Sequence, residues 1–241
     1  MPTPRTWGGR RRGAGRKPSA RRMDLPHRTR PEHKAHLPVH VTLRSKLCCL
    51  RDRRVFTVIR AGIGEASREG FHVVHFSIQA NHVHLFVEAE DTRALSRGVS
   101  GLAIRIARAL NMLLGRNGRV WEKSHHRHEL GTPREVRNGL KYVLQNWKKH
   151  VVDASGIDPC SSGEWFDGWR EPPSAPRQAR SPGSLPVRRP ACSAETASPV
   201  EAPRTWLASR GWRRHGLISF DEAPSLERGR ERPGKVKSKR P

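Results

Sequence analysis

The order of strand-like and helix-like segments along the sequence is the feature that most limits the folds this chain can adopt. Short segments with β-branched or alternating apolar residues indicate strands, and segments with apolar residues three or four apart indicate helices. The expected strands are 37–43, 71–79, 81–89 and 119–130, the last as a strand or a hairpin, and the expected helices are 52–69 and 92–114. This β-α-β-β-α-β order predicts an α+β protein with a ferredoxin-like antiparallel sheet and two helices on one face.

A further helix is expected after the sixth element. Thr132, Pro133 and Glu135 fit the N-cap, N1 and N3 positions of a capping box, so a helix should begin there. Apolar residues at helical spacing carry it to about His150. The same helix carries Tyr142, the only tyrosine among the 241 residues.

Composition divides the chain into three parts. Residues 1–30 are rich in Arg, Gly and Pro and predict a disordered basic arm, whereas 31–170 should form the folded domain. Residues 171–241 predict a mostly disordered Pro/Arg-rich tail, in which Trp206 and Trp212 hint at a short docking or stacking segment. No apolar run approaches the roughly 18 residues of a membrane span, and no secretory signal is recognisable. We therefore expect a cytoplasmic protein without a membrane partner.

The charge of the chain points to the kind of partner it has. The formal net charge is +25, and the excess of Lys and Arg extends through the part that should fold. A surplus of this kind indicates a polyanion such as nucleic acid. The four cysteines show no CxxC spacing, so neither a zinc ribbon nor a disulfide framework is expected.

Two histidines on one expected strand are candidate metal ligands. His82 and His84 are two residues apart, so their side chains lie on the same face of the strand. Val83, Leu85 and Val87 should face the two helices instead. Such a pair is by itself weak evidence, because thirteen histidines make chance pairs common.

The helix with the tyrosine offers a third ligand. Asn146 lies one turn beyond Tyr142, and its amide oxygen can approach the metal if Tyr142 points at the open face of the sheet. Gln145 is the competing choice. Two imidazoles and one amide oxygen leave positions open for substrate, and Mg²⁺ or Mn²⁺ would suit phosphate oxygens. A tyrosine beside such a site is a candidate nucleophile.

Four motifs follow one another in an order that resembles a known family. They are Asn81-His82-Val83-His84-Leu85, Gly101-Leu102-Ala103-Ile104-Arg105, Thr132-Pro133-Arg134-Glu135-Val136 and Tyr142-Val143-Leu144-Gln145-Asn146. Together they resemble the HUH (histidine–hydrophobic–histidine) single-tyrosine transposases of the insertion-sequence-200 type, and within them the REP-associated tyrosine transposases. The resemblance covers roughly residues 30–169.

The resemblance implies a role for each matching residue. Tyr142 matches the nucleophile, His82 and His84 match the metal-binding pair, and Asn146 stands where that branch carries its amide ligand. His126 falls in a strand where relatives often have histidine, and His125 and Cys160 stand where relatives commonly have tyrosine.

The expected activity is transposition by cleavage and rejoining of DNA. The substrate would be single-stranded DNA with hairpin structure, joined to the enzyme through a 5′-phosphotyrosine, and a homodimer is possible in the family. Phosphate contacts are expected from five basic residues: Arg97, Arg105, Arg108, Arg127 and Lys149. The alternatives are a domesticated or non-catalytic nucleic-acid-binding protein of the same fold, and a metal-dependent nuclease that uses water.

Overall fold

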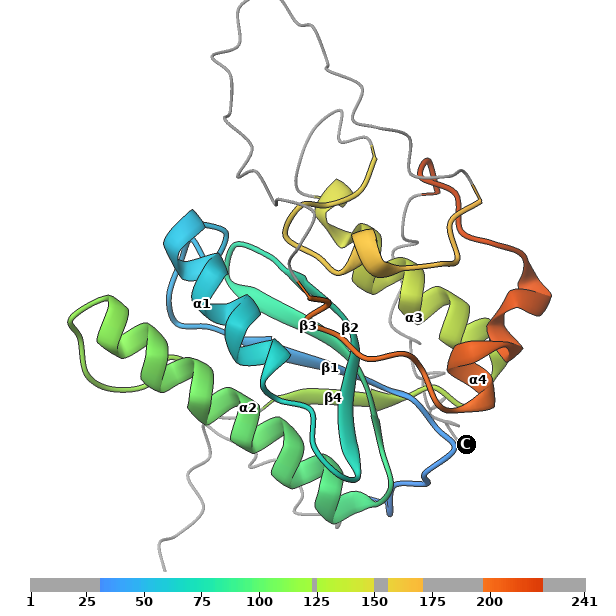
Figure 1. Ribbon diagram of the computed structural model, residues 1–241, viewed down its shortest axis with the longest axis horizontal. Helices are drawn as coiled ribbons and strands as arrows, with labels where there is room; N and C mark the ends of the chain where they lie inside the picture. The colour runs from blue at the N-terminus through green and yellow to red at the C-terminus, as the bar shows by residue number, and fades with distance from the viewer. Residues whose placement is uncertain (1–30, 123–124, 150–155, 171–196, 223–241) are drawn as a thin grey trace, which may run out of the picture. The chain divides into compact units, whose positions relative to one another are not determined.

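The computed structural model describes residues 31–122, 125–149, 156–170 and 197–222 (Figure 1). The chain divides at Pro31, and nearly all described residues belong to the second unit, which begins at Glu32. The predicted disorder of 1–30 and of most of the tail falls outside the described residues.

The second unit is built on a four-stranded antiparallel sheet. Its strands are β1 (Val39–Arg44), β2 (Phe71–Ile78), β3 (His82–Ala89) and β4 (His126–Glu129). They lie side by side in the order β2-β3-β1-β4, and every neighbouring pair is antiparallel. The predicted α+β class and the ferredoxin-like arrangement are confirmed. The segment before β4 adds only an isolated bridge between Ser45 and Trp121, so the expected strand 119–130 is much shorter.

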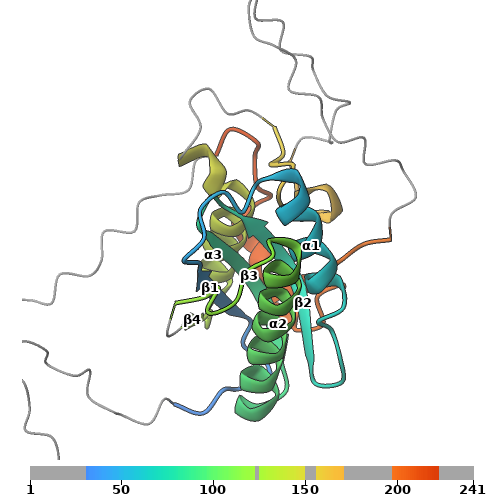
Figure 2. The same cartoon turned by 90° about the vertical axis from the view of Figure 1, so that its left-hand side faces the viewer.

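Two helices cover one face of this sheet, as predicted (Figures 1 and 2). They are α1 (Arg53–Gly64), capped by Asp52, and α2 (Thr92–Leu113), capped by Asp91. Val83, Leu85 and Val87 are buried in the core beneath them. The expected helix 52–69 ends at Gly64, because the following residues turn into β2 through a bridge between Arg68 and Phe71.

The second face of the sheet is not open, which corrects the expectation from the sequence. Helix α3 (Pro133–Gln145) lies over β2 and β3, and the 3₁₀ turn η1 (Asn146–Lys149) continues it. The capping box is present as predicted, but the regular helix stops at Gln145 instead of reaching about His150. A second hydrophobic cluster fills the space between α3 and the sheet, with Phe86, Leu140 and Val143 among its buried members.

Residues 197–222, here called the C-terminal strap, complete this second cluster. The strap contains the short helix α4 (Trp206–Ser209) and the 3₁₀ turn η3 (Gly211–His215). Trp212 is 1% exposed and packs with Phe166 and the α3 side chains. The sequence predicted that this segment belongs to a mostly disordered tail, in which Trp206 and Trp212 suggested a short docking or stacking segment. Here 197–222 is part of the folded unit.

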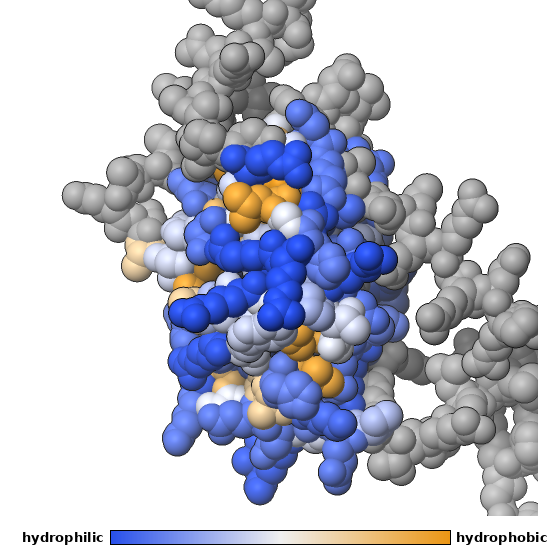
Figure 3. Space-filling view, turned by 90° about the vertical axis from the view of Figure 1, so that its right-hand side faces the viewer, coloured by the Kyte–Doolittle hydropathy of each residue, from blue (hydrophilic) through white to orange (hydrophobic). Residues whose placement is uncertain are grey.

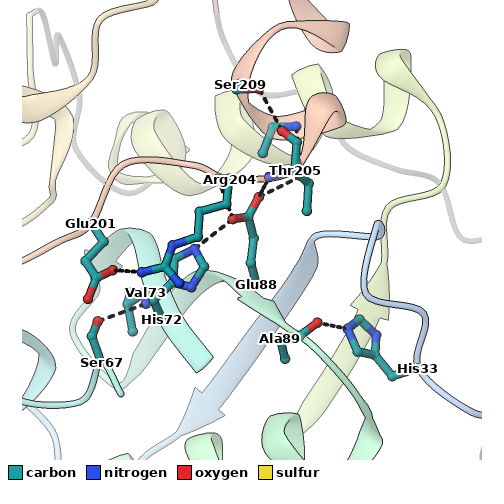
Figure 4. A network of polar contacts seen from close by, with 11 residues as sticks. His33, Ser67, His72, Val73, Glu88, Ala89, Glu201, Arg204, Thr205 and Ser209 are labelled. Carbon is teal, nitrogen blue, oxygen red and sulfur yellow. Dashed lines mark hydrogen bonds and ion pairs between the residues drawn. The ribbon is translucent and has the colours of Figure 1, made fainter. Parts of the chain in front are cut away.

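A buried carboxylate ties the strap to the sheet (Figure 4). Glu88 of β3 accepts hydrogen bonds from His72 Nε2 at 2.7 Å, from the Thr205 hydroxyl at 2.6 Å and from the backbone N–H groups of Arg204 and Thr205. Burial by itself raises the pKa of Glu88, but these hydrogen bonds lower it below its ordinary value. The carboxylate is therefore held ionised and oriented at the start of α4.

A second set of polar contacts joins the strap to α3. Glu222 binds Arg137 through both carboxylate oxygens, at 2.6 and 2.7 Å, and Lys141 at 3.2 Å. The hydrogen bonds from Arg137, followed by those from Lys141, lower the pKa of Glu222 to about 2. Gln145 Nε2 adds a hydrogen bond to the Ser219 carbonyl at 2.6 Å.

The segment before the strap covers the β2 edge of the sheet. The Ile78 N–H donates to the Cys160 carbonyl, and the Ser162 N–H donates to the Phe76 carbonyl. Arg51, just before α1, forms a bidentate ion pair with the buried Asp158, which holds residues 156–170 beside α1. Pairing of this kind removes an exposed edge at which another chain could add a strand.

Two expectations from composition can be compared with the described residues. None of the helices in 31–122, 125–149, 156–170 and 197–222 has the length and apolar character needed to cross a membrane. The three described cysteines, Cys48, Cys49 and Cys160, are free thiols. Burial raises the pKa of the Cys160 thiol to about 11, so this position carries no reactive thiolate.

A buried histidine should make the stability of the domain depend on pH. His75 lies between Phe86 and Phe166, and burial lowers its pKa from 6.5 to about 3. Below pH 6.5 the unfolded chain therefore binds a proton that the folded chain excludes, so the free energy of unfolding falls until about pH 3. In His75→Gln, urea unfolding from pH 7 to 4 should show a slope shallower by up to ~1.4 kcal/mol per pH unit. Equal slopes in the two proteins would contradict this.

Candidate active site

Strand β3 places the two predicted metal ligands side by side on the face toward α3. The ring centroids of His82 and His84 are 4.6 Å apart. His82 Nδ1 lies 2.8 Å from Asn81 Oδ1, an acceptor, so this nitrogen carries the proton in that contact. The lone pair of His82 is then on Nε2, the nitrogen through which this ring would bind a metal.

The hydrogen-bond partners of His84 indicate the same tautomer as for His82. His84 Nδ1 is 3.1 Å from His40 Nε2 and 3.2 Å from Thr42 Oγ1, both on the neighbouring strand β1. His84 Nε2 is 3.1 Å from Asn146 Nδ2. An amide N–H donates, so Nε2 accepts and Nδ1 carries the proton. Strand β1 thus holds the His84 ring with its Nε2 lone pair toward Asn146.

His40 is itself a neutral residue of this cluster. Burial lowers its pKa from 6.5 to about 4, with smaller contributions from the neighbouring His126, His128 and His82. At neutral pH the ring is therefore uncharged. It can share a hydrogen bond with His84 without adding positive charge beside the metal pair.

Asn146 has an unmet hydrogen-bonding requirement at this site. Its side chain is 2% exposed, and its Oδ1 atom has no hydrogen-bond partner among the described residues. A buried acceptor left without a partner costs roughly 1–3 kcal/mol. The amide lies against His84 Nε2, and its two ends can exchange by rotation about the terminal bond. A cation beside His84 would satisfy this oxygen, so the residues present fit a metal.

The side-chain oxygen of Gln145, the competing ligand, also has no hydrogen-bond partner among the described residues, but the other contacts of Gln145 differ from those of Asn146. Its Nε2 donates to the Ser219 carbonyl of the C-terminal strap at 2.6 Å. Asn146, in contrast, lies within hydrogen-bond distance of His84. Among the described residues no three His, Cys, Asp or Glu side chains are grouped as metal ligands.

Tyr142 lies on α3 directly above the imidazoles. Its ring centroid is 5.0 Å from that of His84 and 5.4 Å from that of His40, and both contacts are edge-to-face. The Lys149 ammonium lies 4.5 Å from the centre of the tyrosine ring. The structure therefore brings together Tyr142, His82, His84 and Asn146, with Lys149 beside them.

The predicted arginines lie elsewhere. Arg97, Arg105 and Arg108 are exposed on α2, which covers the opposite face of the sheet. Arg105 pairs with Glu65 at 3.5 Å. Arg127 of β4 lies opposite Val41 of β1, which is buried in the core beneath α1 and α2. Arg127 therefore lies on that side of the sheet. Of the five predicted phosphate contacts, Lys149 alone is at the site.

Position on the sheet identifies further residues near the site. His126 lies opposite Thr42, which in turn lies opposite His84, so all three share one face. His125 precedes β4. His40 and Thr42 were not among the predicted site residues. The alternation of β1 already set them on the polar face, but only the register of β1 on β3 brings them to His84.

Comparisons with known proteins found structural likenesses but no match in sequence. No protein-family model matches the chain, and no curated protein sequence matches it. Among solved structures, the chain is similar to that of a REP-associated tyrosine transposase bound to a REP hairpin. The sequence identity is 14% and the TM-score 0.44, over 52% of this chain and 74% of the other.

Proposed function

We propose that this protein is a transposase that cuts and rejoins single-stranded DNA through a covalent bond between Tyr142 and a 5′ phosphate. One observation carries the proposal. The single tyrosine of the chain lies 5.0 Å from His84, ring centre to ring centre, where two imidazoles and a buried amide with an unmet acceptor also meet. The order of the sequence motifs supports the same function.

His82, His84 and Asn146 would hold the divalent metal. Their ligand atoms would be the two Nε2 nitrogens and the Asn146 amide oxygen, all uncharged. Mg²⁺ or Mn²⁺ bound there would polarise the scissile phosphate and stabilise the charge that develops on it. Strand β1 contributes by holding His84 in one tautomer, which typically strengthens metal binding.

Tyr142 is the nucleophile in this proposal. Its Oη attacks phosphorus, the bond from phosphorus to the 3′ oxygen breaks, and the phenol proton is released as that oxygen leaves as a 3′-OH. The phosphotyrosine retains the energy of the phosphodiester. A 3′-OH of a second strand can then attack it, which restores the tyrosine hydroxyl and joins the strands without ATP.

Lys149 is suited to attract the DNA backbone to this place. Its ammonium is 4.5 Å from the Tyr142 ring centre, so a phosphate beside Tyr142 would lie close to a cation. The interaction with the ring also restrains the tyrosine side chain.

The direct test is the formation of a covalent adduct. Single-stranded DNA from the regions flanking the gene, labelled at either the 5′ or the 3′ end, is incubated with the full-length protein and Mg²⁺ or Mn²⁺. We expect an adduct that resists denaturation and contains only the 3′ label, with a 5′-labelled product ending in 3′-OH. Cleavage without an adduct would indicate a water-dependent nuclease, and binding without cleavage a non-catalytic protein.

Metal binding provides a test that does not depend on activity. In a calorimetric titration with Mn²⁺, Asn146→Ala and His84→Ala should each weaken binding by about tenfold or more, as loss of support at a metal site typically does. Asn138→Ala is the matched control, since Asn138 is exposed on the same helix. Gln145→Ala should retain affinity, because that amide is bound to the strap. A loss in Gln145→Ala together with full binding in Asn146→Ala would reverse the ligand assignment.

A further inference from the structure

The two tryptophans of the C-terminal strap have opposite environments. Trp212 is 1% exposed and belongs to the second hydrophobic cluster, so it accounts for the packing of the strap. Trp206, six residues earlier, is 49% exposed, although a buried indole would contribute far more to stability. Packing of the fold therefore accounts for only part of the Trp206 side chain.

Neighbouring residues hold the exposed indole in place. The Arg214 guanidinium carbon lies 4.8 Å from the centre of the Trp206 ring. Gly211 lies against the same ring, and a Cβ atom there would be 2.6 Å from Trp206 Cζ3. The absence of a side chain at Gly211 thus leaves room for the Trp206 ring, and Arg214 places a cation over that ring. We call this pair the Trp206–Arg214 stack.

The surface around the stack is positively charged. Residues 202–218 contain four arginines and a histidine but no Asp or Glu. Arg204 and Arg213 are paired with Glu201 and Asp167, at 2.8 and 2.7 Å. Arg210 and Arg214 are exposed. On the side of α3 and α4, the molecular surface is largely hydrophilic and interrupted by small apolar areas (Figure 3).

We propose that Trp206, Arg210 and Arg214 form a second contact for single-stranded DNA, in which a base stacks on the Trp206–Arg214 stack and phosphates contact the arginines. Flat aromatic and guanidinium surfaces next to cations are the means by which proteins bind unpaired bases. Tryptophan and arginine are also common at protein interfaces. The net charge of +25 on the chain favours a polyanion. The inference rests on the proposed function only for the identity of the ligand as DNA.

Contacts between the strap and α3 connect this surface to the active site. Glu222 binds Arg137 and Lys141, and Gln145 binds Ser219. Lys141 and Gln145 lie on either side of Tyr142 in the sequence. A DNA strand bound to the C-terminal strap would therefore be held by a segment that is hydrogen-bonded to α3, the helix that carries Tyr142.

The test compares two oligonucleotides with equal backbone charge. Fluorescence anisotropy measures binding of full-length protein to a 20-mer of thymidine and to a 20-mer in which abasic residues replace the central thymidines. Trp206→Ala should weaken binding of the thymidine strand by about tenfold, the usual loss for a stacked base, and the abasic strand much less. Arg210→Ala should weaken both equally and reduce the salt dependence by about one phosphate contact.

Matched variants guard against misfolding as the cause. Met112→Ala, at an 84% exposed position on α2, should bind both strands like the wild type. Arg214→Gln leaves Trp206 in place and should also reduce the preference for thymidine. Unchanged affinity of Trp206→Ala and Arg214→Gln for both strands would overturn the proposal. The same result is expected if this surface binds a protein instead of DNA. At saturating DNA, Trp206→Ala should still form the covalent adduct, because Trp206 takes no part in the chemistry. If the wild type forms no adduct but binds the thymidine strand as described, the proposed role of Tyr142 is wrong and the Trp206 contact stands.

Discussion

Tyr142→Phe is expected to form no covalent DNA adduct while retaining DNA binding. The substitution removes one hydroxyl and keeps the ring that contacts His84, His40 and Lys149. No other residue can supply a phenol, because the chain has a single tyrosine. Adduct yield should therefore fall to background, and the dissociation constant for single-stranded DNA should remain within about twofold, since base and phosphate contacts are intact.

Trp147→Phe is a suitable control for this variant. It changes an aromatic residue five positions further along the same segment and should leave the adduct yield near that of the wild type. Recovery of a normal adduct from Tyr142→Phe would show that another group attacks the phosphate. A loss of DNA binding that parallels the loss of adduct would instead indicate that Tyr142 supports the fold.

The second large effect is expected from Glu88→Ala. This change leaves a buried His72 imidazole and the donors of Arg204 and Thr205 without their common acceptor. Removal of one partner from a buried ionic network typically costs about 3–5 kcal/mol. We expect a corresponding loss in the free energy of unfolding in urea. Trypsin should also cleave faster at the arginines of the C-terminal strap, which Glu88 anchors.

Glu90→Ala is the matched control, because Glu90 is an exposed carboxylate just beyond the same strand. It should be neutral within about 0.5 kcal/mol, as surface substitutions usually are. If Glu88→Ala and Glu90→Ala had equal stability and equal rates of cleavage, the anchoring role of Glu88 would be wrong.

Much of the fold followed from local patterns in the sequence. Alternation and helical spacing predicted the sheet and its two covering helices, because each of these elements buries one regular face. The capping box predicted the start of α3 because the residues at three positions are chemically specific. The end of α3 was less well predicted, since Asn146 to Lys149 can continue either as an α-helix or as the 3₁₀ turn that is present.

The strap was missed because its stabilisation is not local. The apolar residues of 197–222 follow neither a strand nor a helix period, so no regular element is predicted there. Trp212 of the strap is buried against Phe166, and Glu88 of β3 accepts a hydrogen bond from the Thr205 hydroxyl. The Ser219 carbonyl of the strap accepts a hydrogen bond from Gln145 of α3. These partners lie far from the strap in the sequence. None of these partners is identifiable without the fold.

The candidate site was predictable in its principal residues but not in their support. The spacing of His82 and His84 placed both on one face, and the helical repeat placed Asn146 a turn beyond Tyr142. The hydrogen bonds from His84 to His40 and Thr42 depend on the register of β1 against β3, which no local pattern fixes. The sequence could not place the expected arginines relative to the site, because charge alone does not reveal on which side of the sheet a helix packs.

The most direct measurement is the location of Mn²⁺ by anomalous diffraction from crystals of the full-length protein. We predict one strong peak within ligand distance of His82 Nε2, His84 Nε2 and the Asn146 amide oxygen, and adjacent to Tyr142. A well-ordered site without a peak at saturating Mn²⁺, or a peak at other side chains, would contradict the central claim that these four residues surround one cation.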